Sequence, residues 1–361
     1  MNRYRRPGMV MLALLMLVIT GAALAQDDAG AAIADGLNNP RQLFYAADGT
    51  LYIAEAGLAG DESIEGDFGP VLAGNTARVV SVPPEGGEPT VVVDNLPSAQ
   101  AFENIVGANS VYVTEDGTLW IVIGNAPPEM DYARGVLVLN ASGEEQRFID
   151  FQAIEEAQNP DGEDIATNPV DIDVSADGMI YIMDASGNAL YRMTADGEPE
   201  VFAVWEELPV PTSVSVGPEG DIFVGFLSAF PFPPGSARVE RWSPEGELVE
   251  TYEGLTAVTD VLAADDGTVY AVEMSGSFGD AGWTPNAGRV LSVSADGITP
   301  LAEGLNFPYG LAMAADGTLI VSMNSAFVEP GTGVVVPVSS DMGTAPDTAP
   351  GEPAGTPEAS G

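Results

Sequence analysis

Short runs of alternating apolar and polar residues, separated by Gly-containing turns, cover most of this 361-residue chain. The stretch "NNPRQLFYAADGTLYIAEAG", residues 38–57, has apolar positions two residues apart on both sides of an Asp-Gly pair. A period of two is typical of half-buried β-strands, and Asp-Gly is a common hairpin turn. We therefore expect two antiparallel strands joined at Asp48-Gly49.

The same hairpin pattern recurs six times without gaps. Its first position, which we call the anchor, is Pro40, Ala108, Pro169, Pro211, Val258 or Pro308. Eight residues later each unit has an acidic residue followed by Gly, at Asp48, Asp116, Asp177, Glu219, Asp266 and Asp316. Further β-rich segments follow most hairpins, which gives about four strands per unit. Radially repeated four-stranded units are typical of a β-propeller.

The repeat predicts an all-β fold: a six-bladed β-propeller of four-stranded antiparallel blades. The last unit lacks a fourth strand, whereas "AAIADGL" (Ala31–Leu37) precedes the first anchor and matches the segment before the last one. We expect this N-terminal strand to join the last blade and close the ring, because closure leaves no exposed sheet edge.

The two ends of the chain differ in composition from the repeat. Three Arg residues, an apolar run and Ala23-Leu24-Ala25 predict a signal peptide at residues 1–25. The propeller is expected over 26–340, and a disordered Pro/Gly/Thr/Ala-rich tail over 341–361. The protein is therefore expected to be exported, periplasmic or extracellular, monomeric, and without membrane insertion.

Composition removes several kinds of chemistry. The chain has no Cys and no His, all eleven basic residues are Arg, and the formal net charge is −43. Thiolate nucleophiles, Ser-His-Asp triads, Schiff-base lysines and zinc sites of His or Cys are excluded. Such an acidic surface also repels nucleic acid. Carboxylate, hydroxyl, amide and Arg chemistry remain, with Ca²⁺ as the plausible metal.

In a propeller the first strand of each blade lines the central channel, so equivalent positions form rings. Two residues after the anchor come Gln42, Ser110, Asp171, Ser213, Asp260 and Gly310. We expect a ligand to contact Gln42, Ser110 and Ser213, together with Arg41 and Tyr309 directly after their anchors. Asp171 and Asp260 could hold a hydrated cation; the alternative is that they only face channel water.

A second ring lies fifteen residues after the anchor and contains three acids, Glu55, Asp184 and Glu273. They are further candidates for a Ca²⁺ site. The alternative is cross-strand ion pairing, because Arg78 and Arg289 open the third strands opposite Glu55 and Glu273. Asp184 has no such Arg, only Asn188.

The long loops between second and third strands are expected on the same face as the anchors, which we call the long-loop face. Trp283, Phe230 and Phe232 lie in these loops and could stack on a ligand or seal the loops. The acidic segments 60–67 and 159–164 lack the ligand spacing of a Ca²⁺-binding EF-hand.

The segment from Gly36 to Gly57, with Pro40-Arg41, Asp48-Gly49 and Tyr52-Ile53-Ala54-Glu55-Ala56-Gly57, resembles the start of ScyD/ScyE family proteins. These are exported bacterial propellers related to the NHL-repeat group. The resemblance covers essentially the whole mature chain, and Gln42 replaces the usual Gly. A looser resemblance is to gluconolactonase-like propellers, which implies a central Ca²⁺ or other divalent cation held by Glu, Asn and Asp.

Two functions follow as hypotheses. The first is a non-catalytic propeller that binds a small molecule or protein through the long-loop face. The second is a Ca²⁺-dependent lactonase or hydrolase with a carboxylate-lined central site, in which a metal polarises a carbonyl and a carboxylate acts as base. Glycoside chemistry by a carboxylate pair is a third possibility that no feature singles out.

Overall fold

The computed structural model describes residues 32–66, 69–101, 104–207 and 209–340. The signal peptide predicted at 1–25 and the tail predicted at 341–361 lie outside these residues. The described chain is almost entirely β-structure, with one α-helix, α1 (Phe151–Gln158). No helix in the described ranges is long and apolar enough to cross a membrane.

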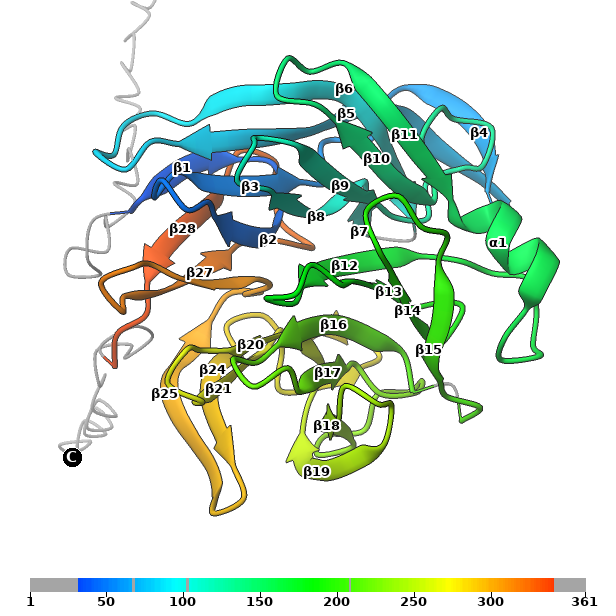
Figure 1. Cartoon of the computed structure of the whole chain (residues 1–361). Helices are drawn as coiled ribbons and strands as arrows, with labels where there is room; N and C mark the ends of the chain where they lie inside the picture. The colour runs from blue at the N-terminus through cyan, green and yellow to red at the C-terminus, as the bar shows by residue number, and fades with distance from the viewer. Residues whose placement is uncertain (1–31, 67–68, 102–103, 208, 341–361) are drawn as a thin grey trace, which may run out of the picture.

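The strands form antiparallel sheets that follow one another along the chain (Figure 1). The first sheet contains β2 (Pro40–Tyr45), β3 (Leu51–Glu55), β5 (Gly69–Val82), β6 (Thr90–Ala101) and β7 (Asn104–Val106), with β4 (Glu62–Gly66) paired to β5. The second contains β8 (Ala108–Val113), β9 (Leu119–Ile123), β10 (Gly135–Leu139) and β11 (Glu145–Asp150). The third contains β12 (Pro169–Val174), β13 (Ile180–Asp184), β14 (Ala189–Met193) and β15 (Glu200–Val204).

The remaining sheets repeat this order. The fourth contains β16 (Pro211–Val216), β17 (Ile222–Phe226), β18 (Ala237–Trp242) and β19 (Leu248–Leu255). The fifth contains β20 (Val258–Ala263), β21 (Val269–Glu273), β24 (Gly288–Ser294) and β25 (Gly297–Leu305), with the small hairpin of β22 (Phe278–Gly279) and β23 (Gly282–Trp283) in its long loop. The last contains β26 (Leu311–Met313), β27 (Leu319–Met323), β28 (Gly333–Pro337) and β1 (Ala34–Leu37).

The predicted hairpins are present and share one register. In five of the six units the anchor lies opposite the residue fifteen positions later, as Pro40 does with Glu55 and Val258 with Glu273. At the first turn Gly49 has a φ of 86°, and the carboxylate of Asp48 accepts a hydrogen bond from the Thr50 N–H at 2.9 Å. Gly at this position allows the positive φ that a β-carbon would disfavour.

The N-terminal strand pairs with the last sheet, as predicted. Ala34 lies opposite Val335 in the antiparallel pair of β1 and β28. One hydrophobic cluster then joins the last sheet to the first, with Leu37, Ile320 and Val335 packed together with Leu43 and Ile53. The innermost strands β2, β8, β12, β16, β20 and β26 contact one another in cyclic order. This is the all-β, four-stranded antiparallel architecture of a β-propeller.

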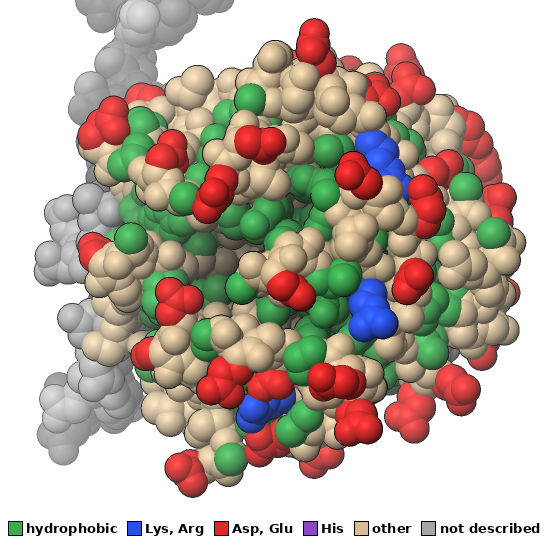
Figure 2. All heavy atoms as spheres, viewed as in Figure 1, with side chains coloured by type: hydrophobic (Ala, Val, Ile, Leu, Met, Phe, Trp, Pro, Cys, Tyr) green, Lys and Arg blue, Asp and Glu red, His purple; other side chains and the backbone are tan. Residues whose placement is uncertain are grey.

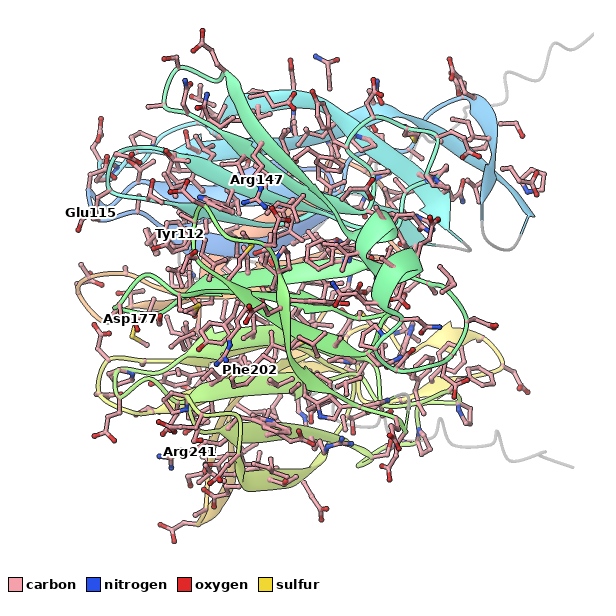
Figure 3. All side chains as sticks on the ribbon, turned by 45° about the vertical axis from the view of Figure 1, so that its right-hand side comes forward. Tyr112, Glu115, Arg147, Asp177, Phe202 and Arg241 are labelled. Atoms are coloured by element: carbon pink, nitrogen blue, oxygen red, sulfur yellow. The ribbon has the colours of Figure 1, made fainter. Side chains whose placement is uncertain are left out.

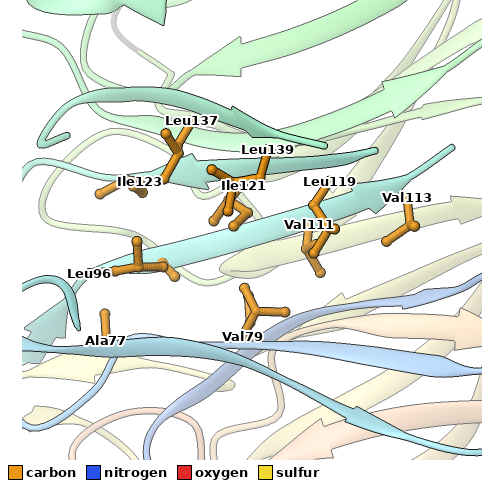
Figure 4. Close-up of a cluster of buried hydrophobic side chains, with 12 residues drawn as sticks. Ala77, Val79, Leu96, Val111, Val113, Leu119, Ile121, Ile123, Leu137 and Leu139 are labelled. Atoms are coloured by element: carbon orange, nitrogen blue, oxygen red, sulfur yellow. The ribbon is translucent and has the colours of Figure 1, made fainter. Parts of the chain in front are cut away.

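Apolar side chains between adjacent sheets form the core. Figure 4 shows one such layer, in which Val79 and Leu96 of the first sheet face Val111, Ile121 and their neighbours of the second. Ile121 is fully buried. The outer surface is acidic: Asp and Glu side chains are spread over the face shown in Figure 2, with few Arg among them. The turn acids point into solvent, as Glu115 and Asp177 do in Figure 3.

Three segments differ from what the sequence pattern predicts. Residues 57–75, one of the segments between a second and a third strand that we expected to be long loops, contain β4 and the first half of β5. The loop of residues 275–288 contains the β22–β23 hairpin. Helix α1 was not anticipated; it begins after Asp150, whose carboxylate accepts a hydrogen bond from the Ala153 N–H at 3.0 Å as an N-cap.

Candidate functional site

A hollow of about 570 Å³ runs along the centre of the ring of inner strands. We call it the axial hollow. It opens toward the Asp-Gly turns, because turn residues such as Asp266 and Gly317 line it. Besides the turn acids Asp265 and Asp266, its Asp, Ser and Gln lining residues lie on the inner strands: Gln42, Ser110, Asp171, Asp173, Ser215 and Asp260. The sequence therefore identified four of these channel-lining positions, and missed Asp173 and Ser215.

The two predicted channel acids bridge neighbouring sheets. Asp171 accepts hydrogen bonds from the Ser110 hydroxyl and from the backbone N–H of Val214, both at 2.9 Å. Asp260 accepts one from the Leu311 N–H at 2.6 Å, and each acid also accepts one from the residue that follows it. Both side chains are 5% exposed. These carboxylates hold inner strands together, which accounts for their position without a bound ion.

Burial makes the channel acids hard to ionise. Removal from water raises the pKa of Asp171 to about 7, although three hydrogen bonds oppose the shift. Burial also raises the pKa of Asp173 to about 6. The pKa of Asp260 is raised well above its usual value by burial and by the Asp171 carboxylate, so these two acids titrate as a coupled pair.

Arg41 and Tyr309 contact each other but do not line the axial hollow. The Arg41 guanidinium lies 4.6 Å from the Tyr309 ring centre and is 2% exposed. Its Nη2 donates to the carbonyl of Ile105 at 2.6 Å and to Oδ1 of Asn104 at 3.0 Å, whereas Nε and Nη1 have no partner among the described residues. Burial lowers the pKa of Arg41.

The neutral polar residues that lie two positions after an anchor, such as Gln42 and Ser213, are also buried. The Gln42 side chain is 4% exposed and donates weakly to the Thr259 carbonyl, at 3.4 Å. Ser213 is fully buried, and its hydroxyl has no partner among the described residues. Of the five predicted ligand residues, Gln42 and Ser110 line the axial hollow, whereas Arg41, Ser213 and Tyr309 do not. Their role in ligand binding stays a prediction.

Glu55 and Glu273 form the predicted cross-strand ion pairs. Arg78 donates to both carboxylate oxygens of Glu55, with Nη2 to Oε1 at 3.1 Å. Arg289 Nε donates to Glu273 Oε2 at 2.6 Å, and the Thr256 N–H donates to Glu273 Oε1 at 2.8 Å. Both carboxylates are fully buried. Burial raises the pKa of Glu273 although Arg289 opposes it. The geometry supports the ion-pair interpretation.

Asp184 uses hydrogen bonds where its two counterparts use Arg. Its Oδ1 accepts from the backbone N–H groups of Asn168 at 2.7 Å, Gly187 at 3.0 Å and Ser186 at 3.1 Å. Its Oδ2 accepts from the Thr167 hydroxyl. Burial raises the pKa of Asp184 in spite of these bonds. Among the described residues no three Asp, Glu, His or Cys side chains gather closely enough to hold a metal.

A second hollow, of about 750 Å³, lies on the long-loop face between the first and last sheets. We call it the amide hollow, because its lining includes Asn39, Gln100, Asn306 and Asn324, with Phe327 beside them. The Asn306 amide donates to Asn324 Oδ1 at 2.9 Å, and the Asn324 amide donates to the Thr332 carbonyl at 2.8 Å.

Sequence reasoning missed the amide hollow. Its signal was present, since Asn39 lies one residue before the first anchor and Asn306 two residues before the last. The hollow forms only when those two units become neighbours in space.

The aromatic residues of two long loops pack together at the edge of this face. Phe232 lies 5.0 Å from Trp283 and 5.4 Å from Phe278 between ring centres. Phe230 contacts Phe232 but is 76% exposed. The predicted alternative is that these aromatics seal the loops. Phe232 and Trp283 pack with each other across two loops, whereas Phe230 stays exposed.

Comparison with known proteins supports the fold. No family model matches the chain, and no curated protein matches its sequence. Solved structures match at low identity. Virginiamycin B lyase from Staphylococcus aureus, solved as a catalytically inactive His-to-Ala variant with quinupristin, has 13% identity, a TM-score of 0.51, and coverage of 85% of this chain and 86% of that one.

Two further structures have similar scores. A putative oxidoreductase (glucose dehydrogenase) from Thermus thermophilus has 14% identity and a TM-score of 0.53 over 85% of this chain and 98% of that one. The calcium-binding protein regucalcin from Agrobacterium tumefaciens has 12% identity and a TM-score of 0.51 over 85% and 93%. The neighbours are gluconolactonase-like β-propeller proteins, and at this identity the likeness shows the fold alone.

Proposed function

We propose that this chain is an exported, six-bladed β-propeller of the ScyD/ScyE type that binds an uncharged, hydroxyl-rich ligand such as a sugar at the long-loop face. The observation that carries this proposal is the amide hollow, with neutral hydrogen-bonding side chains and an aromatic ring on one wall. Cyclic contact of the inner strands and the pairing of β1 with β28 support the six-bladed closed ring.

The lining of the amide hollow suits a neutral polar ligand. Asn306, Asn324 and Asn39 use their side-chain N–H groups to hold one another and nearby carbonyls, so the wall is fixed before a ligand arrives. The side-chain amide of Gln100 makes no hydrogen bond among the described residues, and the residue is exposed. Phe327 is 37% exposed and offers an apolar face. Sugars combine hydroxyl groups with an apolar face, which matches this combination.

The chemistry of the chain also favours binding. The neighbouring lyase is inactive when a His is replaced by Ala, and this chain has no His with which to perform equivalent chemistry. The acids of the second ring already accept hydrogen bonds from Arg or the backbone. Among the described residues that line the amide hollow, the one carboxylate is that of Glu329, which is exposed.

The binding proposal is tested by thermal-shift screening of the purified protein against neutral mono- and oligosaccharides, followed by calorimetry on any hit. Phe327→Ala should weaken binding roughly tenfold, since it removes the stacking surface. Gln100→Ala should also weaken it. Phe230→Ala is the matched control, because this exposed ring lies outside the amide hollow. Equal affinity in the Phe327 and Phe230 variants and the parent would contradict the proposed site.

The second candidate is a Ca²⁺-dependent lactonase or hydrolase centred on Asp171 and Asp260. It is favoured by the raised pKa of both acids, which a cation in the axial hollow would lower. The residues fit a metal poorly, because both carboxylates already accept hydrogen bonds from neighbouring strands, Asp171 from two of them and Asp260 from one. We therefore derive no catalytic step. Lactone hydrolysis that requires Ca²⁺ and is lost in Asp171→Asn would establish this activity.

A further inference from the structure

Glu155 on helix α1 is an unusual acid in this structure. It is fully buried, and neither carboxylate oxygen accepts a well-formed hydrogen bond from the described residues. The Ala166 N–H lies close enough to lower its pKa slightly, but burial and the Asp184 and Asp161 carboxylates outweigh it and raise the pKa to about 7. A buried carboxylate surrounded by like charge is costly unless something compensates it.

Other oxygen atoms near Glu155 also lack partners. Asn188 is 4% exposed, and its Nδ2 donates to Asp161 Oδ2 at 2.9 Å and to the Ser186 carbonyl at 3.1 Å. Because both neighbours are acceptors, the Asn188 side chain must present Nδ2 to them. Its Oδ1 is then left without a donor among the described residues. The hydroxyl of Tyr191, a fully buried residue, is likewise unpartnered. Its pKa is raised by burial and by Asp184, Glu155 and Asp161, so the hydroxyl faces the same acids.

Gly187 shows that two of the acids border one space. A β-carbon at this position would lie 3.0 Å from Asp184 Oδ2 and 3.2 Å from Glu155 Oε2. The two oxygens are therefore no farther apart than the sum of these distances, 6.2 Å. The φ of Gly187 is not positive, so the backbone conformation does not require Gly here. A side chain at this position would instead be crowded by the two carboxylates. We call Glu155, Asp184, Asn188 and Tyr191 the oxygen cluster.

We propose that the oxygen cluster binds Ca²⁺, with Glu155 as the charged ligand and Asp184 Oδ2 and Asn188 Oδ1 as further oxygen ligands. Glu155, Asn188 and Tyr191 are buried and have side-chain oxygens without a partner among the described residues, and Glu155 Oε2 and Asp184 Oδ2 border one position; a hard cation binds oxygen atoms of this kind. Asp161 Oδ2 accepts a hydrogen bond from Asn188 Nδ2 and so orients the amide. Residues next to metal ligands commonly orient them through such hydrogen bonds.

The oxygen cluster contains only two carboxylates, so an amide oxygen and water would complete the coordination. This agrees with the lack of three close Asp, Glu, His or Cys side chains in the described part of the chain. Ca²⁺ takes six to eight oxygen ligands and tolerates irregular geometry, whereas zinc prefers the His and Cys that this chain lacks. The ion would tie α1 to the turn between β13 and β14, far from the amide hollow in sequence.

Tyr191 provides a direct assay. Tb³⁺ replaces Ca²⁺ at oxygen sites, and its emission under tyrosine excitation reports a Tyr close to the ion. We expect sensitised Tb³⁺ emission from the full chain, displaced by Ca²⁺, and a melting temperature that rises with Ca²⁺ added after chelator treatment. Ca²⁺ would be added up to about 10 mM, beyond the roughly 10⁻⁴–10⁻³ M range of extracellular Ca²⁺ modules.

Two matched variants localise the ion. Glu155→Gln should abolish both the Ca²⁺-dependent rise in melting temperature and the sensitised emission. Without Ca²⁺ it should be at least as stable as the parent, because it removes a buried charge, so loss of folding is distinguishable from loss of binding. Glu156→Gln, on the exposed side of the same helix, should behave like the parent. Asn188→Gly should weaken Ca²⁺ affinity while retaining the positive φ at that position.

The outcomes separate this site from the channel. A Ca²⁺ response that persists in Glu155→Gln but disappears in Asp171→Asn would assign the ion to the axial hollow and overturn the proposal. No Ca²⁺-dependent change in the parent at the highest concentration would overturn it as well. A response lost in Glu155→Gln and retained in both Glu156→Gln and Asp171→Asn is the expected result.

Discussion

Removal of Arg289 should destabilise the protein far more than removal of an ordinary surface Arg. Arg289 Nε donates to Glu273 Oε2 at 2.6 Å, and the Glu273 carboxylate is fully buried while the Arg289 side chain is 33% exposed. Arg289→Ala would leave a buried carboxylate whose remaining donor in the described part of the chain is the Thr256 N–H. Such an unpaired buried charge, rather than the lost attraction, sets the cost.

The magnitude follows from the exposure of the two partners. Breaking a fully buried pair costs about 3–5 kcal/mol, whereas an exposed pair contributes about 0–1 kcal/mol. Because solvent already reaches a third of Arg289, water can partly replace it, and we expect a loss of about 2–3 kcal/mol. This corresponds to a fall in melting temperature of roughly 3–5 °C, at an unfolding entropy of about 2.1 cal/mol/K per residue over about 300 folded residues.

Urea unfolding at pH 7.5 with chelator present measures the effect, in a double-mutant cycle with Glu273→Gln. Arg241→Ala is the matched control: Arg241 is 34% exposed, close to Arg289, but its partner Asp221 is 18% exposed rather than buried. The control should lose no more than about 1 kcal/mol. A loss in Arg289→Ala no larger than in Arg241→Ala would refute the reasoning.

The same variant should change the pH dependence. The folded pKa of Glu273 is raised by burial and held down by Arg289, so loss of Arg289 raises it further. An acid whose pKa is higher in the folded than in the unfolded state favours folding at low pH, and this contribution is lost as pH rises through the folded pKa. The difference between parent and Arg289→Ala should therefore be larger at pH 8 than at pH 5.

Three further predictions test the architecture. Gly310→Ala would place a β-carbon 2.5 Å from Gln42 Oε1 and should cost about 1–3 kcal/mol in urea unfolding, since the inner strands cannot separate easily. Ile121→Ala should cost about 2–5 kcal/mol by leaving a cavity between the first two sheets, whereas Ile165→Ala, 46% exposed, should cost less than about 0.5 kcal/mol. In chelator-containing buffer the free energy of unfolding should fall as pH rises from about 4 to about 7, because the pKa of Asp171 is about 7 in the folded state. Asp171→Asn should make the free energy of unfolding depend less on pH over this range. An unchanged pH dependence in this variant would contradict the assignment to Asp171.

The repeat in the sequence was sufficient to predict the two strands of each hairpin and, in five of the six units, their register. Period-two patterning and the acid-Gly turns specify each hairpin locally, and the constant spacing of fifteen residues placed Pro40 opposite Glu55 in the structure. The Arg partners of Glu55 and Glu273 followed from the same register, because residues opposite each other on adjacent strands face the same side.

Features outside the repeat could not be found in this way. Helix α1 lies in an insertion between the second and third sheets, so Glu155 has no equivalent in other units. The amide hollow combines Asn39 with Asn306, more than two hundred residues apart, and exists only because the last sheet packs on the first. Comparing aligned units reveals what the units share, whereas the oxygen cluster depends on an insertion in one unit and the amide hollow on the contact between two units.

The shortage of basic residues explains which acids are structural. With 54 acids and eleven Arg, most buried carboxylates cannot be paired with a cation and must rely on neutral donors. Asp171, Asp260 and Asp184 do so, each accepting hydrogen bonds from backbone N–H groups. Glu273 uses one of the few Arg. Among the described residues Glu155 has no Arg partner and no well-formed hydrogen bond, and the charges that act on it are the Asp184 and Asp161 carboxylates. A buried acid that the chain itself does not compensate needs a cation or a proton from solution, and the unpartnered oxygens around Glu155 favour the cation.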